Sequence, residues 1–397
     1  MKITSVECYL GQFITMKINT DEGIYGWGEA GLAYGNSFEA AFGQCQDFAK
    51  LIIGMDPFDT EKIWEHLHRH TFWGMGGGVV ITSAMAAIDT ACWDIKGKAL
   101  GVPVYKLLGG KTNPKLRAYA SQLQFGWRKD IEAKDGLTLL YDPKDYYRVV
   151  KEAVDEGYDA VKIDPVFAPT EPAPMGDVMA TQGTQIRGCY REHDLKRSVE
   201  RIAVAREAGG PDMDIIVEIH SLLDANTAAE LGKALEPLHI MYFEEPTSPE
   251  NPSNFRHIKQ KCDLPLATGE RSYTRWGFRQ FFEDRTLSVI QPDLCNTGGI
   301  TETKKICDMA QVYDMGVQIH VCGGPIATAA ALQVEAAIPN FTIHEEHNAN
   351  LKNIFIQAGK YYYKPENGYY TVPDLPGIGQ EMTDEFLATC RKVVIGG

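Results

Sequence analysis

The chain has 397 residues, too many for a single small core, and its length predicts two or three domains. Its formal net charge of −14 opposes binding to polyanions, so we expect neither nucleic acid nor a membrane surface as a partner. An anionic small molecule would need local help, such as a bound cation. Hydrophobic residues make up 44% of the chain and charged residues 23%, which is typical of a folded globular protein and excludes a disordered one.

The cysteines and the N-terminal segment bear on location. The nine cysteines are scattered from Cys8 to Cys390 and never form C-x-x-C, which argues against a disulfide framework and against a zinc knuckle. Residues 1–18 alternate polar and apolar side chains, and no later window approaches about 18 apolar residues. We therefore expect a cytoplasmic protein without an export signal or a membrane span.

Residues 1–115 predict an α+β head domain. The strand-like segments, separated by turn-prone residues, are 3–10, 13–20 and 23–30. Together they predict a small antiparallel meander. In residues 83–100 apolar side chains recur at spacings of three and four, which predicts a helix that ends at Gly101.

From residue 116 onward, β-branched apolar runs alternate with sequence of helical period. The runs are 116–121, 158–164, 214–220, 240–246, 264–270, 287–293, 316–321 and 341–346. Eight strands that alternate with helices favour a closed parallel barrel, here residues 116–358, over an open sheet. Residues 165–188 are rich in Pro, Gly, Ala and Met and predict a long loop on the active-site side. We expect the tail, 359–397, to return to the head.

Six acidic or histidine side chains each end one of these runs. They are Glu218, Glu244, Glu270, Asp293, His320 and Glu345, and subtraction of their numbers gives intervals of 26, 26, 23, 27 and 25 residues. That interval is the length of one βα unit. Because the C-terminal strand ends of a β/α barrel point to a common centre, we expect these side chains to converge.

Glu218, Glu244 and Glu270 come from three consecutive units and predict a metal site. Like charges at close range repel and raise one another's pKa unless a cation neutralises them. Ligands that are all oxygen favour a hard divalent ion, and Mg²⁺ would leave positions open for water and substrate. The alternative for any single glutamate is a helix cap or a surface ion pair, but three at one register favour the metal site.

Asp293 and His320 end neighbouring strands, and together they predict a general-base dyad. A carboxylate beside an imidazole fixes its tautomer and stabilises the protonated ring, which suits a general base near neutral pH. The alternative for Asp293 taken alone is to cap a turn, and the alternative for His320 taken alone is to be a buried core histidine. His220 stands two residues after Glu218, so a regular strand would place both on one side. The alternative role for His220 is to orient Glu218.

Three further residues at strand ends are harder to assign. Lys162 could place a cation near a substrate carboxylate. Asp164 is most simply an ion-pair or hydrogen-bond partner of Lys162 or of His220. Glu345 stands at the register where a protonated carboxyl would hydrogen-bond a substrate carboxylate.

The ordered motifs carry a family resemblance. They are TDEGIYGWGEA, AIDTACWDIKGKALGVPV, KID, EIH, FEEP, TGER, QPDLCNTGGI and QIHVCGGP. Over nearly its whole length the chain resembles the mandelate racemase subgroup of the enolase superfamily, and in particular its galactonate- and mannonate-type acid-sugar dehydratases. The resemblance implies a capping domain over a modified (β/α)7β barrel, Mg²⁺ at Glu218, Glu244 and Glu270, and a base dyad of Asp293 and His320. It also implies a homo-oligomer, a dimer or an octamer.

Departures from the family pattern narrow the expected reaction. Racemases of the subgroup place a second lysine at the position of Asp164, so two-base racemisation is doubtful here. The first metal ligand, commonly Asp in relatives, is the longer Glu218. Galactonate-type dehydratases have a histidine two residues beyond that ligand, acting as the acid, and this chain keeps it as His220. Mannonate-type relatives share the long loop but lack the QPD and histidine combination.

We therefore expect a Mg²⁺-dependent dehydratase of a sugar acid. His320 would remove the proton α to the carboxylate, and His220 would protonate the departing 3-hydroxyl, which gives a 2-keto-3-deoxy acid. The substrate-binding residues we expect are Asn36, Trp73, Asp164 and Arg271. The alternatives are an epimerase or cycloisomerase on the same fold, or a sugar-acid-binding barrel without activity.

Overall fold

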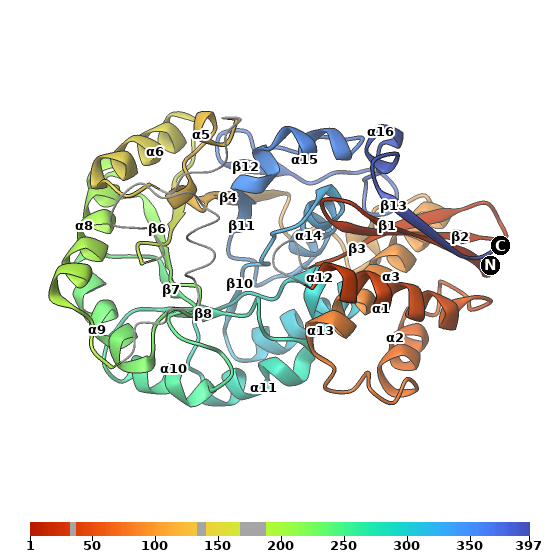
Figure 1. Ribbon diagram of the computed structural model, residues 1–397, viewed down its shortest axis with the longest axis horizontal. Coiled ribbons are helices and arrows are strands. Elements are labelled where there is room, and N and C mark those ends of the chain that lie inside the picture. Colours follow the sequence, from red (N-terminus) through yellow and green to blue (C-terminus); the bar gives the residue numbers. More distant parts are fainter. Residues whose placement is uncertain (32–36, 133–139, 167–187) are drawn as a thin grey trace.

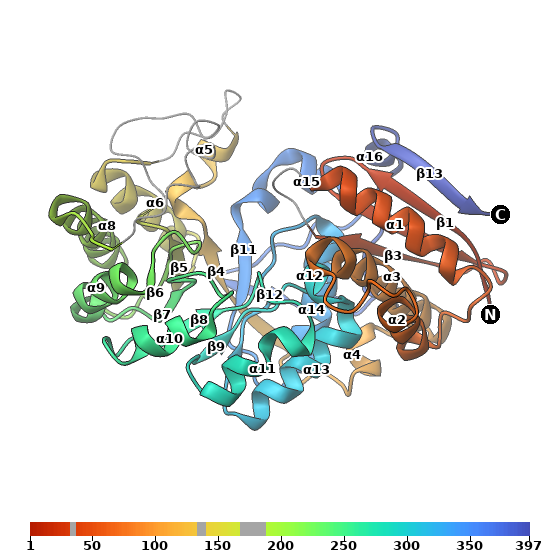
Figure 2. The ribbon, with the colours of Figure 1, turned by 60° about the horizontal axis from the view of Figure 1, so that its bottom comes forward.

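The computed structural model describes residues 1–31, 37–132, 140–166 and 188–397 (Figure 1). Within these residues a small α+β head lies beside a larger ring of parallel strands and helices (Figures 1 and 2). Asn36 and nearly all of the expected loop 165–188 lie outside the described residues.

The head sheet is an antiparallel meander completed by the end of the chain. Its strands are β1 (Ile3–Leu10), β2 (Ile14–Thr20), β3 (Tyr25–Ala30) and β13 (Arg391–Gly396). The order is β13-β1-β2-β3, and β13 runs antiparallel to β1. The alternation of residues 1–18 thus comes from strands that bury one face, in agreement with the predicted meander.

Helices α1 (Phe38–Ile52) and α3 (Gly78–Leu100) cover this sheet, and α2 (Thr60–Arg69) packs against both of them. The close approach of α3 to β3 depends on glycine, since a Cβ at Gly28 would lie 1.8 Å from the carbonyl oxygen of Ala87. Helix α3 ends at Gly101, whose φ of 67° is the left-handed conformation that glycine adopts at helix ends, as predicted.

Helix α3 is long and apolar enough to cross a membrane, which the sequence-based expectation of no span did not anticipate. Within the described residues it is the only such helix, and 72% of its apolar window is buried against the rest of the protein. It packs on β3 and on two helices of the ring, α12 (Leu294–Thr297) and α13 (Gly299–Val312). Its apolar sequence is therefore explained by burial on several sides.

The larger sheet is parallel and closes on itself. Its parallel strands are β4 (Lys115–Ser121), β5 (Ala160–Ile163), β6 (Asp214–Glu218), β7 (Tyr242–Glu244), β8 (Leu266–Thr268), β9 (Val289–Ile290), β10 (Gly316–Val317) and β11 (His344–His347). The order is β10-β9-β8-β7-β6-β5-β4-β11, and a single parallel bridge between Val317 and Phe341 joins the two ends. The antiparallel strand β12 (Tyr369–Thr371) pairs with β4.

A helix follows each of the first seven parallel strands on the outside of the ring. These helices are α6 (Pro143–Asp155), α8 (Glu192–Gly209), α9 (Ala225–Leu235), α10 (Pro252–Lys259), α11 (Thr274–Asp284), α13 and α14 (Pro325–Ala337). Short helices in the connections are α4 (Val104–Leu107), α5 (Lys129–Glu132), α15 (Asn353–Ala358) and α16 (Asp384–Leu387). The predicted fold class, a (β/α)7β barrel with an α+β domain, is confirmed.

The barrel interior is filled by one inward-pointing side chain from most strands. This inner layer contains Tyr119, Ala160, Ile216, Tyr242, Ala267, Val289 and Ile343. It is a packed core, so ligands can enter only at the C-terminal strand ends.

Seven of the eight parallel strands are shorter than the predicted apolar runs, whereas β4 begins one residue before its run. The run 287–293 contains only the two-residue strand β9. Ile219 and Val321 lie just beyond β6 and β10 and are still buried. Apolar residues therefore continue past the last ladder hydrogen bond, and the hydrophobic pattern overstates the length of every parallel strand except β4.

Candidate active site

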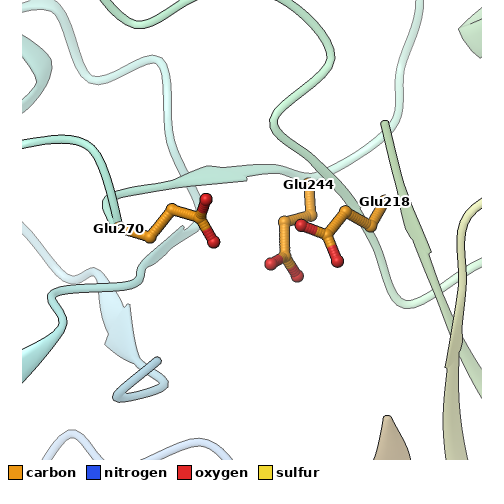
Figure 3. Close-up of side chains that lie close together, drawn as sticks. All are labelled: Glu218, Glu244 and Glu270. Atoms are coloured by element: carbon orange, nitrogen blue, oxygen red, sulfur yellow. The ribbon is translucent and has the colours of Figure 1, made fainter. Parts of the chain in front are cut away.

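Three glutamates meet at the C-terminal ends of β6, β7 and β8 (Figure 3). Glu218 and Glu244 are the last residues of their strands, and Glu270 lies two residues beyond β8. One carboxylate oxygen from each lies within 4.8 Å of the others. The register of the strand ends, and not proximity in sequence, brings these side chains together.

The charges of this cluster are strongly perturbed. Burial and the neighbouring charge of Glu218 raise the pKa of Glu244 to about 8. Burial acts in the same direction on Glu270, but the charges of His320 and Arg271 outweigh it and hold the pKa of Glu270 well below its usual range. Among the described residues, Glu244 Oε2 is buried without a hydrogen-bond partner.

These properties fit a metal ion. The donors are all carboxylate oxygens, one of them unpaired, and an added cation would relieve the repulsion that raises the pKa of Glu244. Oxygen donors of this kind suit a hard divalent ion. The cluster can therefore hold a metal through Glu218, Glu244 and Glu270.

His320 and Asp293 form one hydrogen-bonded pair beside the cluster. The two residues form a parallel bridge between the ends of β9 and β10, and His320 Nδ1 lies 2.7 Å from Asp293 Oδ2. His320 Nε2 lies 3.0 Å from Glu270 Oε2. Burial acts to lower the pKa of His320, but the charge of Glu270 and the bond to Asp293 raise it well above its usual value. The ring is thus oriented with Nε2 toward the carboxylates.

His220 and Asp164 form a second pair on the other side. His220 Nδ1 lies 2.5 Å from Asp164 Oδ2, and its Nε2 lies 3.2 Å from Glu218 Oε1. Burial lowers the pKa of His220, yet the charges of Glu218 and Asp164 prevail and raise it to about 9. Of the two partners that the sequence offered for Asp164, the structure shows His220.

His220 does not reach the centre by strand alternation. Strand β6 ends at Glu218, and His220 and Ser221 have φ values of 47° and 61°, in the left-handed region. The assumption of a regular strand was therefore wrong, although the side chain arrives beside Glu218. A left-handed residue after a strand turns the chain sharply, and such strain is found mainly where the surrounding structure holds it in place.

Two glutamines that sequence reasoning missed support this side. Gln122, just after β4, donates from Nε2 to Glu218 Oε2 at 2.7 Å. Gln124 donates to Gln122 and accepts the backbone N–H of Asp164 at 3.2 Å. Gln124 lies in a single 3-10 turn, Leu123–Phe125, and Gln122 stands just before it. The sequence there has no periodicity, and only the place of both residues after the first barrel strand could have indicated them.

Lys162 lies beneath the cluster, fully buried. Its Nζ contacts Glu244 Oε1 and Glu345 Oε1 at 2.9 Å and Glu218 Oε2 at 3.1 Å. Burial favours the neutral amine, but these carboxylates raise the pKa of Lys162 well above its usual value. In this arrangement the ammonium is a counter-charge to three glutamates.

Glu345 is held as a carboxylate in this arrangement. It accepts hydrogen bonds from Ser121 Oγ at 2.6 Å and from the backbone N–H of Val321 at 3.0 Å. Burial would raise the pKa of Glu345, but Lys162 and His320 lower it. That direction is the reverse of the protonated carboxyl expected from the sequence.

Of the expected substrate-binding residues, Arg271 lies beside the carboxylate cluster and Trp73 does not contact it in the described residues. Arg271 Nη2 lies 3.0 Å from Glu270 Oε1, and its Nε lies 2.9 Å from Glu245 Oε2. Glu245, the second glutamate of FEEP, was missed in the sequence analysis, and it holds this guanidinium in place.

Trp73 lies between α2 and α3 and is 74% exposed. It contacts the ring of Phe72 edge-on, and no described contact joins it to the cluster.

Two family descriptions match the chain. Residues 1–109 match the N-terminal domain of mandelate racemase and muconate lactonizing enzyme, and residues 145–386 match the enolase C-terminal domain-like family. Together they cover the head and nearly all of the barrel.

Individual relatives extend this comparison. A D-galactonate dehydratase of Pectobacterium atrosepticum is 32% identical over 99% of this chain and 95% of its own length. A crystal structure of an enolase superfamily member from Salmonella Typhimurium is 49% identical, with a TM-score of 0.93 over 99% of both chains. The 3,6-anhydro-D-galactonate cycloisomerase of Zobellia galactanivorans is 28% identical, with a TM-score of 0.81, over 98% of this chain and 100% of the other.

Proposed function

This chain belongs to the mandelate racemase and muconate lactonizing enzyme family of the enolase superfamily, and we propose that it dehydrates an aldonate to a 2-keto-3-deoxy acid. Its curated relatives place it among the acid-sugar dehydratases, which are hydro-lyases. D-galactonate is the first substrate to test, because those relatives are named for it.

The observation that carries this proposal is the pair of histidines on either side of one carboxylate cluster. His320 Nε2 reaches Glu270 and His220 Nε2 reaches Glu218, and each ring is oriented by its own aspartate. Elimination of water needs one group that takes a proton and one that gives a proton. Two oriented imidazoles next to a metal-type site supply both.

The chemistry of the residues derives from this geometry. His320 Nε2 removes the proton from C2, and Asp293 stabilises the imidazolium that forms. The bond to Asp164 favours the protonated ring of His220, which gives its Nε2 proton to the 3-hydroxyl oxygen. The C3–O bond breaks, water leaves, a C2–C3 double bond forms, and the enol tautomerises to the 2-keto acid.

We propose Mg²⁺ as the ion held by Glu218, Glu244 and Glu270, because the donors are oxygens alone. When bound, Mg²⁺ would offset the charge of these glutamates, including the Glu270 charge that raises the pKa of His320. It would also offset the charge that develops on the substrate carboxylate. Lys162 and Arg271 add fixed positive charge around the same carboxylates.

A second candidate, epimerase or cycloisomerase, is favoured by one observation. The absence of a second lysine made a base on the other face doubtful, yet His220 with Asp164 is a second histidine–carboxylate pair. Such a pair can take or give a proton at carbon, and a cycloisomerase is among the structural neighbours. Both candidates share proton removal at C2 and differ only in the later steps.

One experiment separates the candidates. Purified protein is incubated with hexonates and pentonates, with Mg²⁺ or with EDTA, and 2-keto product is detected with semicarbazide. We expect keto-acid formation with at least one aldonate in Mg²⁺ and none in EDTA. If C2 stereochemistry is inverted without any 2-keto-3-deoxy product, the epimerase replaces the dehydratase. If no sugar acid reacts or exchanges its α-hydrogen, a binding role without catalysis replaces both.

The setting of the enzyme is also a proposal. All nine cysteines lie in the described residues and none of them forms a disulfide, which suits the reducing cytoplasm. A homo-oligomer, dimer or octamer, stays a prediction from the family resemblance. Size-exclusion chromatography with light scattering measures it directly.

A further inference from the structure

The end of strand β3 in the head contacts both barrel loops that carry the His320–Asp293 pair. Strand β3 packs against α12 and α14, the helices that follow β9 and β10, and Figures 1 and 2 show it beside them. The segment Glu29–Gly31 therefore gives the head a contact with each of the two catalytic loops, in addition to the packing of α3 on α12.

Glu29 makes the stronger of these contacts. Its side chain is buried, its Oε1 accepts the backbone N–H of Gly324 at 2.5 Å, and its Oε2 accepts that of Ala327 at 3.1 Å. Gly324 caps helix α14 and follows His320 by four residues. The side chain of Glu29, in the head, thus accepts two N–H groups at the start of α14, the barrel helix that begins five residues after His320.

The second contact holds the other loop. The backbone N–H of Gly31 donates to the carbonyl oxygen of Cys295 at 2.9 Å. The N–H of Cys295 in turn donates to Asp293 Oδ1 at 2.8 Å, while Asp293 Oδ2 holds His320. Asp293 and His320 are therefore each followed, within four residues, by a backbone group that hydrogen-bonds to the end of β3.

The fit around Glu29 is tight. A Cβ at Gly323 would lie 2.7 Å from Glu29 Oε1, and one at Gly324 would lie 2.9 Å from Glu29 Oε2. The two glycines of HVCGGP thus allow this carboxylate to approach the loop. Burial raises the pKa of Glu29 to about 8, and the negative charge of Asp293 contributes in the same direction.

We infer that Glu29 is a positioning residue, through which the head domain fixes the loop after β10 and so the aim of His320 at the substrate. The inference rests on the proposed function, because it assigns the proton abstraction to His320. Glu29 does not touch the reacting atoms. Its effect is on the rate of the chemical step, since displacement of a catalytic group by about 1 Å can cost about 100-fold in rate.

The test compares Glu29→Gln with a matched control, Asp89→Asn. Asp89 is also a buried head carboxylate that caps a barrel helix, accepting from Thr301 N and Oγ1 at 2.8 and 2.6 Å. Thr301 follows Asp293 by eight residues and lies within α13. Both variants lose a buried cap, but only Glu29→Gln disturbs the loop next to His320.

We expect Glu29→Gln to lower kcat by about 100-fold with KM and Mg²⁺ affinity within about twofold, because the loss is confined to the chemical step. Asp89→Asn should lower Tm comparably and leave kcat within about twofold of wild type. In crystals of Glu29→Gln we expect the loop 321–324 and the His320–Asp293 hydrogen bond to be displaced. Wild-type kcat in Glu29→Gln, or an equal loss of kcat in Asp89→Asn, overturns the inference.

Glu29→Asp decides the matter if Glu29→Gln does not fold. The aspartate keeps the carboxyl group but is one methylene too short to reach both N–H groups, so kcat should fall between those of wild type and Glu29→Gln. An unchanged kcat in Glu29→Asp contradicts the inference. If wild-type protein turns over no sugar acid, the proposed function fails, and the displacement of His320 in the crystals still tests the role of Glu29.

Discussion

The two histidine–aspartate pairs face the same carboxylates but are built in different ways. Asp293 and His320 bridge neighbouring strand ends, and Asp293 also caps α12 through the N–H of Cys295. His220 instead lies in a left-handed turn after β6, and its partner Asp164 accepts the N–H of Val166. A backbone bridge just beyond the sheet therefore links the two members of the first pair, whereas a left-handed turn brings His220 to Asp164, which directly follows β5.

This difference agrees with a division of labour. A base that removes a proton from carbon must be accurately oriented toward that carbon. The backbone bridge to Asp293 and the head contacts at β3 orient His320 in this way. An acid that protonates a departing oxygen can rest on a less regular element. The two pairs should then fail separately when they are substituted.

Glu244→Gln removes what both pairs share. Neither histidine contacts Glu244 in the described hydrogen bonds and ion pairs, so both pairs should persist while metal binding is lost. The loss of turnover should exceed the roughly 10²- to 10⁴-fold cost of losing a single acid or base. Calorimetric titration with Mg²⁺ and keto-acid assays measure it, with the exposed Glu250→Gln in the loop after β7 as the control. Turnover that survives both this substitution and EDTA would remove the metal from the proposal.

His320→Asn should abolish both halves of the reaction. Without the base no proton leaves C2, so neither exchange of the α-hydrogen in D₂O nor keto-acid formation should occur, each reduced by about 10²- to 10⁴-fold. NMR of the recovered substrate measures exchange, and semicarbazide measures product. Exchange at the wild-type rate would move the base elsewhere, and Lys162 would be the next residue to test.

His220→Asn should separate the two halves. Proton removal by His320 remains, so α-hydrogen exchange should continue, while keto-acid formation falls by about 10²- to 10⁴-fold because the acid is missing. The same two measurements apply. If product formation is unchanged, another group protonates the leaving hydroxyl; if exchange is lost as well, His220 takes part in proton removal and the epimerase gains support.

Asp164→Asn should have a smaller effect of the same kind. The substitution leaves His220 in place but removes the carboxylate 2.5 Å from its Nδ1, so the ring loses its orientation and the charge that favours its protonated form. We expect keto-acid formation to fall by about 10- to 100-fold, the usual cost of losing the partner of a functional side chain. Exchange should stay near the wild-type rate. Loss of exchange in this variant would contradict the division between the two pairs.

The strand ends could be predicted because each functional residue terminates an apolar run. Glu218, Glu244 and His320 carry that signal, and the nearly constant interval between them reveals the repeating unit. The convergence of the three glutamates followed from barrel geometry alone.

Residues outside the barrel strands carry no such signal. Gln122 and Gln124 lie at a single 3-10 turn after β4, and Glu29 belongs to a head strand whose sequence does not indicate the barrel helix that it caps. The left-handed turn at His220 broke the alternation that the prediction used. Asn36 falls outside the described residues, so its role stays a prediction.

The smallest expected effect is on stability, and it sharpens the comparison of the pairs without any substrate. In EDTA, the charges of Glu218 and Asp164 raise the pKa of His220 from 6.5 to about 9, against the opposing effect of burial. A group whose pKa is higher in the folded state stabilises the fold fully below its unfolded pKa, and this contribution is lost as pH rises through the folded value. The free energy of unfolding should therefore decline between about pH 6.5 and pH 9, with a slope of at most about 1.4 kcal/mol per pH unit for this group. Urea denaturation at several pH values measures the slope.

His220→Asn should reduce this slope without a change in m-value. His320, whose pKa is also raised, should still contribute to the pH dependence of stability in that variant. An identical decline in wild type and His220→Asn would mean that His220 is not protonated in the folded protein near neutral pH, and the assignment of the general acid would fall with it.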